Sequence, residues 1–117
     1  MSGYIQTVKG RLAPEELGVT MPHEHLLWDQ TCWWAGEPEE LSLREFVHQP
    51  VSMEILGQIY YHAHRHLDNI RQYSVELAIS EAMWLKRAGG SALVDVTSLG
   101  IGRDPRALLA VSEVTGL

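Results

Sequence analysis

The chain has 117 residues, of which 45% are hydrophobic, and its 9 Lys and Arg against 15 Asp and Glu give a formal net charge of −6. These values fit one globular domain or part of a larger one, and they argue against a nucleic-acid partner, because neutralising phosphates requires clustered basic residues. The single cysteine, Cys32, cannot form an internal disulfide, and neither a signal peptide nor an apolar stretch of about 20 residues is visible, so we expect a cytoplasmic protein without a membrane partner.

Short strands and turns are predicted for residues 1–27. Residues 4–8 alternate weakly in hydrophobicity, and residues 13–18 have the pattern of a single helical turn that ends at a glycine. Residues 19–27 form the next predicted strand. Pro22 interrupts it, which is tolerated near a strand end, where one backbone donor can be missing.

A long, aromatic-rich loop is predicted for residues 28–51, because tryptophan, glycine and proline recur there with little periodicity. We expect one short helical turn within it. Long irregular segments in compact domains tend to carry function, so this loop is a candidate lid or pocket wall. Ser52 is a suitable N-cap for a helix over residues 53–66.

The second half of the chain is more regular. Ser74 is a good N-cap for a helix over residues 75–88, in which apolar side chains recur at helical spacing. A glycine pair ends that helix, and the β-branched run 92–98 predicts a buried strand. Asp104 then caps a helix over 105–115. This order is typical of parallel βα units, so we interpret residues 1–117 as a single partial domain, the first quarter to third of a larger α/β domain.

The most informative motif is His23-Glu24-His25. Residues at i and i+2 of a strand project to the same side, so the two imidazoles can converge on one metal ion. Imidazole suits zinc and related divalent ions. The alternative interpretation, two polar residues at a strand end beside a solvated Glu24, stays open.

A second histidine group, His62, His64 and His66, competes with this motif. On a continuous helix His62 and His66 would share a face at i, i+4 and could bind a metal. The local pattern places no carboxylate or thiolate beside them, so solvated surface histidines are the more common outcome. His48 stands alone.

Asp95 lies within an otherwise apolar strand, where a carboxylate needs a partner. It could hydrogen-bond a ligand histidine, or it could form a salt bridge at the strand end. Trp28, Trp33 and Trp34 follow a strand end closely and could line an apolar substrate pocket. Alternatively, they pack the long loop onto the helices.

Several blocks of the sequence resemble the phosphotriesterase-like family of the amidohydrolase superfamily. The first is Gly10 followed by Glu15-Glu16-Leu17-Gly18-Val19-Thr20-Met21-Pro22-His23-Glu24-His25-Leu26-Leu27. Later blocks occur in the family's order and spacing: Ala88-Gly89-Gly90, Val94-Asp95-Val96-Thr97, Gly102-Arg103-Asp104-Pro105 and Thr115-Gly116-Leu117. The resemblance implies the N-terminal part of a TIM (β/α)8 barrel, about its first two βα units.

The resemblance also implies a hydrolase that uses two divalent metals, usually zinc, to cleave a small-molecule phosphotriester, lactone or related ester. His23 and His25 would be metal ligands at the end of the first barrel strand, and no catalytic residue is assigned within this segment. The family's bridging carboxylate, two further histidines and aspartate have no matching positions here. We therefore expect little or no activity from the chain alone. We also expect it to be either marginally stable or associated, for example as a homo-oligomer, because an unclosed parallel sheet exposes an edge and apolar surface.

Two other functions remain as alternatives. The chain could be a non-catalytic fragment or interaction module that retains part of the metal site. It could also be a small helical metal sensor that uses His62 and His66.

Overall fold

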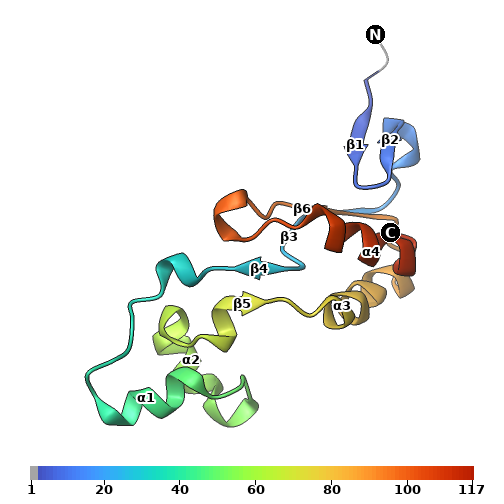
Figure 1. Cartoon of the computed structure of the whole chain (residues 1–117). Coiled ribbons are helices and arrows are strands. Elements are labelled where there is room, and N and C mark those ends of the chain that lie inside the picture. The colour runs from blue at the N-terminus through green and yellow to red at the C-terminus, as the bar shows by residue number, and fades with distance from the viewer. Residues whose placement is uncertain (1–2) are drawn as a thin grey trace.

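The computed structural model describes residues 3–117 and shows an elongated α/β arrangement with extents of 59 × 28 × 21 Å (Figure 1). One part contains a pair of parallel strands covered by two helices, and the other contains two short helices joined to it through a two-stranded ribbon. Three separate two-stranded sheets form in all within the described residues.

An antiparallel hairpin of β1 (Ile5–Thr7) and β2 (Gly10–Leu12) opens the described chain and projects from the rest (Figure 1). The single helical turn predicted for residues 13–18 is present as a 3-10 turn over Pro14–Glu16. Its first turn is closed by the Glu16 carboxylate, which accepts the backbone N–H of Ala13 at 3.0 Å.

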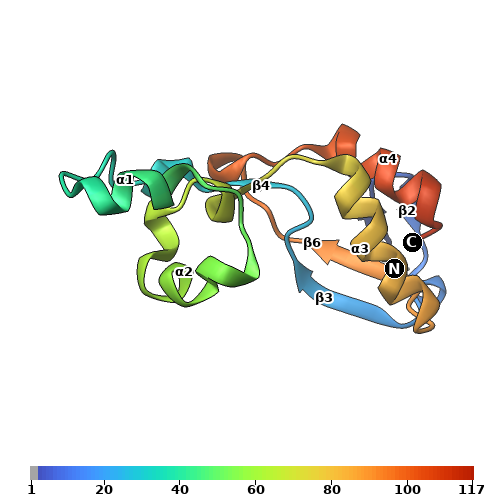
Figure 2. The same cartoon turned by 90° about the horizontal axis from the view of Figure 1, so that it is seen from below.

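The parallel pair consists of β3 (Thr20–Glu24) and β6 (Ala92–Asp95), which run side by side in the same direction (Figure 2). Between Met21 and Glu24, β3 carries one residue more than its partner, so a β-bulge lies around Pro22. A bulge leaves a residue out of the hydrogen-bond ladder, which explains how the strand accommodates a residue without a backbone N–H. β6 ends at Asp95, three residues before the predicted end of the strand.

Helices α3 (Val75–Arg87) and α4 (Pro105–Thr115) pack against each other and against Leu26 and Leu27, which follow β3. The predicted caps are present: the Ser74 hydroxyl accepts the N–H of Leu77, and the Asp104 carboxylate accepts two amides at the start of α4. Gly116 ends α4 with a φ of 71°, a left-handed conformation that favours glycine. The shared core of this part consists of Leu27, Ala78, Ala82 and Val111.

The segment predicted as a loop over 28–51 is more ordered than expected. It contains β4 (Trp28–Asp29), a 3-10 turn over Thr31–Trp33 and the two-turn helix α1 (Leu41–His48). α1 forms because Leu43, Phe46 and Val47 recur at i, i+3 and i+4 and bury one face of the helix. The prediction of one short helical turn therefore underestimated this helix.

The helix predicted over 53–66 is also shorter than expected. The structure has a 3-10 turn over Met53–Ile55, helix α2 (Leu56–His62) and another 3-10 turn over Ala63–Arg65. The helix ends at His62 because the residues that follow form hydrogen bonds with other segments. Leu67, for example, donates its N–H to the Val47 carbonyl at 3.0 Å. Strand β5 (Arg71–Gln72), which pairs with β4, was not predicted.

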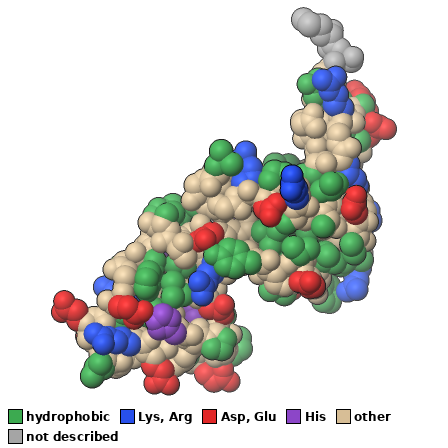
Figure 3. All heavy atoms as spheres, viewed as in Figure 1, with side chains coloured by type: hydrophobic (Ala, Val, Ile, Leu, Met, Phe, Trp, Pro, Cys, Tyr) green, Lys and Arg blue, Asp and Glu red, His purple; other side chains and the backbone are tan. Residues whose placement is uncertain are grey.

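Several large apolar side chains are exposed on the helical face of the parallel pair, where hydrophobic side chains gather over α3 and α4 (Figure 3). Leu77 and Trp84 on α3 are 50% and 63% exposed, and Val114 on α4 is 65% exposed. This surface agrees with the expectation of exposed apolar area in a partial barrel. No helix within residues 3–117 has the length and apolar character required to cross a bilayer.

Candidate metal centre

The candidate site lies where β3 and β6 end. Because the two strands are parallel, their carboxyl ends meet at one edge, and the polar residues that follow each strand come together there. His23 lies in β3, His25 follows it directly, and Thr97 comes two residues after the end of β6.

The two imidazoles lie close to each other at this edge. Their ring centroids are 5.7 Å apart, and the ring planes are inclined at 77°. His23 is exposed and His25 is half-buried. The Nδ1 atom of His25 lies 2.9 Å from the Thr97 hydroxyl, which leaves its Nε2 atom available to a ligand.

Asp95 joins the ends of the two strands. One carboxylate oxygen accepts the backbone N–H of Leu26 at 3.0 Å, and the other accepts the N–H of Thr97 at 2.9 Å. Within the described residues, the Asp95 side chain therefore accepts hydrogen bonds from backbone amides. We had considered a hydrogen bond between Asp95 and a histidine; the residue that contacts His25 in this way is Thr97. The sequence analysis missed Thr97, although a hydroxyl two residues after a carboxylate in an apolar strand was a usable signal.

The donor set at this edge fits part of a divalent-metal site. Two neighbouring imidazoles, one with a free Nε2, are suitable ligands for zinc or a similar ion. A catalytic zinc needs at least three protein ligands, and residues 3–117 contain no group of three or more His, Cys, Asp or Glu placed to hold an ion. Further ligands would have to come from outside the described residues.

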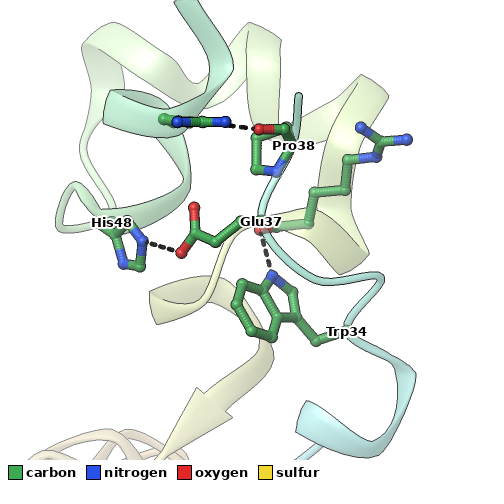
Figure 4. A network of polar contacts seen from close by, with 6 residues as sticks. Trp34, Glu37, Pro38 and His48 are labelled. Atoms are coloured by element: carbon green, nitrogen blue, oxygen red, sulfur yellow. Dashed lines mark hydrogen bonds and ion pairs between the residues drawn. The ribbon is translucent and has the colours of Figure 1, made fainter. Parts of the chain in front are cut away.

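Two of the three tryptophans, Trp33 and Trp34, contact residues just after α2. Trp33 lies edge-on to His64, with ring centroids 6.0 Å apart, and Trp34 donates its indole N–H to the Arg65 carbonyl at 3.2 Å (Figure 4). These contacts agree with the alternative in which the tryptophans pack the loop onto the helices. Trp28 differs, since it is half-buried on β4, close after the strand that carries the site.

The histidines of the second group contact aromatic side chains. His62 and His66 both contact the Phe46 ring, at centroid distances of 6.1 and 4.8 Å, and His64 contacts Trp33. Because the helix ends at His62, the i, i+4 relation on which the sensor hypothesis rests is interrupted. His48, at the end of α1, pairs with Glu37 (Figure 4).

His66 is fully buried, and its environment favours the neutral imidazole. Its Nδ1 accepts the backbone N–H of Asn69 at 3.2 Å, and Nε2 has no hydrogen-bond partner among the described residues. Burial lowers the pKa of His66 below its ordinary value of 6.5, against a smaller opposing effect of Asp68. A proton on Nδ1 would remove the acceptor that the Asn69 backbone amide has in this structure.

The stability of the chain should therefore fall as the pH drops from about 6.5 toward the lowered pKa of His66. In that range the unfolded chain binds a proton that the folded chain does not, so protonation favours unfolding. His66→Asn should weaken this dependence, since the asparagine oxygen can accept the same amide without titrating. Urea unfolding at several pH values would check this, and an equal pH dependence in both proteins would contradict it.

A further polar cluster, which the sequence analysis missed, joins the β4–β5 ribbon to the loop after β6. Tyr73 donates its hydroxyl to Asp29 at 2.7 Å, and Thr31 donates both its N–H and its hydroxyl to the same carboxylate. These hydrogen bonds lower the pKa of Asp29, and the bond from the Thr31 hydroxyl has the largest effect. The same bond between Tyr73 and Asp29 raises the pKa of Tyr73. Gly102 packs so closely that a Cβ there would lie 3.2 Å from the Asp29 side chain.

Comparison with known proteins gives a consistent result. The sequence model described as "Phosphotriesterase family" matches residues 3–117. The N-acetyltaurine hydrolase of Homo sapiens is 35% identical over 120 residues, which cover 100% of this chain and 33% of the human protein. That of Dictyostelium discoideum is 31% identical over 131 residues, covering 95% of this chain and 35% of the relative. The chain thus spans about a third of the length of these curated relatives.

Two solved structures extend the comparison. A resiniferatoxin-binding protein from Rhodobacter sphaeroides has 39% identity and a TM-score of 0.90, over 99% of this chain and 32% of that protein. A mutant organophosphorus hydrolase from Deinococcus radiodurans has 28% identity and a TM-score of 0.56, over 96% of this chain and 26% of that protein.

Proposed function

The chain belongs to the phosphotriesterase family, and from this premise we propose that it supplies the first pair of metal ligands of a metal-dependent hydrolase. Its fold is that of part of a TIM barrel, as the sequence predicted, and it covers 26–32% of the solved structures to which it is similar. Active sites of such barrels lie at the carboxyl ends of the strands. The histidine pair lies at the carboxyl ends of β3 and β6, and this single observation carries the proposal.

In this proposal His23 and His25 hold a divalent ion, for which zinc is the first candidate. When bound, such an ion lowers the pKa of a water molecule and polarises the substrate oxygen. Asp95 keeps the two strand ends at a fixed separation, and Thr97 holds the ring of His25. A cytoplasmic location also belongs to the proposal.

The bond that is cleaved is proposed to be the acyl C–N or C–O bond beside a carbonyl group in a small molecule. The sequence resemblance suggested esters, including lactones and phosphotriesters, whereas the relatives at 31–35% identity are named for N-acetyltaurine, whose acetyl group is held by an amide bond. Carboxylic esters, lactones and amides are all attacked at a carbonyl carbon, whereas a phosphotriester is attacked at phosphorus. We therefore place a small N-acyl amide first and the ester class second.

A chimera tests the proposed activity. This chain would replace the matched third of the Mus musculus N-acetyltaurine hydrolase, which is 33% identical over 120 residues. We expect the purified chimera, supplied with zinc, to bind two ions and to hydrolyse N-acetyltaurine or a small ester. The 117-residue chain alone, with two ligands at most, should bind no more than one ion and show no turnover.

Zinc titration of the isolated chain, followed by NMR of its histidine ring signals, decides where the metal binds. The proposal expects the signals of His23 and His25 to shift first. Shifts confined to His62 and His66 would favour the metal-sensor alternative. A folded chimera that binds two ions but has no hydrolase activity would favour the non-catalytic module.

A further inference from the structure

We propose that Thr97 is a positioning residue that fixes the tautomer of His25, with the proton on Nδ1 and with Nε2 as the metal-binding atom. The part of this inference that concerns metal rests on the proposed function. The tautomer itself is a property of the chain without metal.

The hydrogen bonds of the Thr97 hydroxyl support this tautomer. A hydroxyl has one proton to donate, and a backbone carbonyl can only accept. The Thr97 Oγ1 atom donates to the Leu27 carbonyl over a long distance of 3.4 Å, and it lies 2.9 Å from His25 Nδ1. We assign the hydroxyl proton to the carbonyl, because the carbonyl can only accept, whereas a ring nitrogen can donate or accept. The hydroxyl oxygen is then an acceptor toward the ring, so that Nδ1 carries the proton and Nε2 has the free lone pair.

The opposite arrangement would defeat metal binding at Nε2. If the hydroxyl donated to Nδ1, the neutral ring would carry its proton on Nε2, and the Leu27 carbonyl would lose the Thr97 hydroxyl as its donor. Ligand histidines in metal sites are usually oriented through their other ring nitrogen by a hydrogen-bond partner. Thr97 occupies that place here.

Thr97 is itself held rigidly, which is what a positioning group requires. The residue is 1% exposed. Its N–H donates to Asp95 at 2.9 Å, and its carbonyl accepts the Nε–H of Arg103 at 2.6 Å. Both of these bonds use backbone atoms of Thr97, so a change of its side chain leaves them in place. The residue can therefore be tested without dismantling the surrounding network.

The test compares Thr97→Val, which has the same shape but no hydroxyl, with Thr97→Ser, which keeps the hydroxyl. Nitrogen-15 NMR of the metal-free chain at about pH 8, above the ordinary histidine pKa of about 6.5, reports which ring nitrogen is protonated. We expect His25 to carry its proton on Nδ1 in the unchanged chain and in Thr97→Ser. In Thr97→Val the population should move toward the Nε2–H form that free imidazole side chains prefer.

Zinc affinity gives a second readout, with an expected loss of about 10- to 100-fold in Thr97→Val and recovery in Thr97→Ser. Circular dichroism checks that each variant folds. If Thr97→Val does not fold, the tautomer of His25 in the unchanged chain still tests the proposal. A proton on Nε2 of His25 there would overturn it. An unchanged tautomer in folded Thr97→Val also overturns it. Nδ1 protonation without any zinc binding at His25 would contradict the proposed function while leaving the tautomer assignment intact.

Discussion

Replacing His25 with alanine should abolish tight zinc binding and hydrolysis in the chimera. Removing a residue that hydrogen-bonds a metal ligand already lowers metal affinity or activity by about 10- to 100-fold. Removing a ligand itself should therefore lower zinc affinity by more than roughly 100-fold. His23→Ala should have a similar effect, because the two rings lie next to each other at the same strand edge, with centroids 5.7 Å apart. Isothermal titration with zinc and a steady-state assay of the same preparations would measure both losses.

His48→Ala is the matched control for this experiment. His48 is an exposed histidine that pairs with Glu37 in the helical part of the chain, so its removal should leave zinc affinity and turnover unchanged. His62→Ala adds a second comparison, since the metal-sensor alternative requires it to remove metal affinity. The assignment of the histidine pair is wrong if His25→Ala retains full affinity or if His62→Ala removes it.

Replacing Asp95 with alanine should produce the largest loss of stability at this edge. The carboxylate accepts the amides of Leu26 and Thr97, which belong to segments about 70 residues apart in the sequence. Leaving a buried amide without a partner costs about 1–3 kcal/mol. Because Asp95 is only half-buried and water can partly replace it, we expect the free energy of unfolding to fall by about 2–4 kcal/mol.

Urea unfolding monitored by circular dichroism would measure this change, with Asp104→Ala as the control. Asp104 also accepts two backbone amides, but it does so at the exposed start of α4, where loss of an N-cap costs about 1 kcal/mol. Asp95→Asn, which keeps one carbonyl oxygen, should fall between the other two variants. If Asp95→Ala were no more destabilising than Asp104→Ala, Asp95 would not be what joins the two strand ends.

Features that depend on near neighbours in the chain were predictable from the sequence. Ser74, Asp104 and Gly116 mark the ends of α3 and α4, because caps act on amides and carbonyls within one helical turn. The apolar run before Thr97 identified β6. The His23-Glu24-His25 motif indicated the candidate site, since two residues one pleat apart face the same side of a strand.

Features that depend on distant segments were decided by the tertiary structure. α2 ends at His62 because the residues after it bond to α1 and to each other, and no local signal in residues 53–66 encodes those contacts. The bond between His25 and Thr97 joins positions 72 residues apart, and the parallel pairing of β3 with β6 creates it. The sequence alone therefore indicated the candidate metal ligands and determined where α3 and α4 begin and end. Only the folded chain decided which side chain orients His25, because hydrogen bonds between strand ends depend on strand register, which local patterns do not specify.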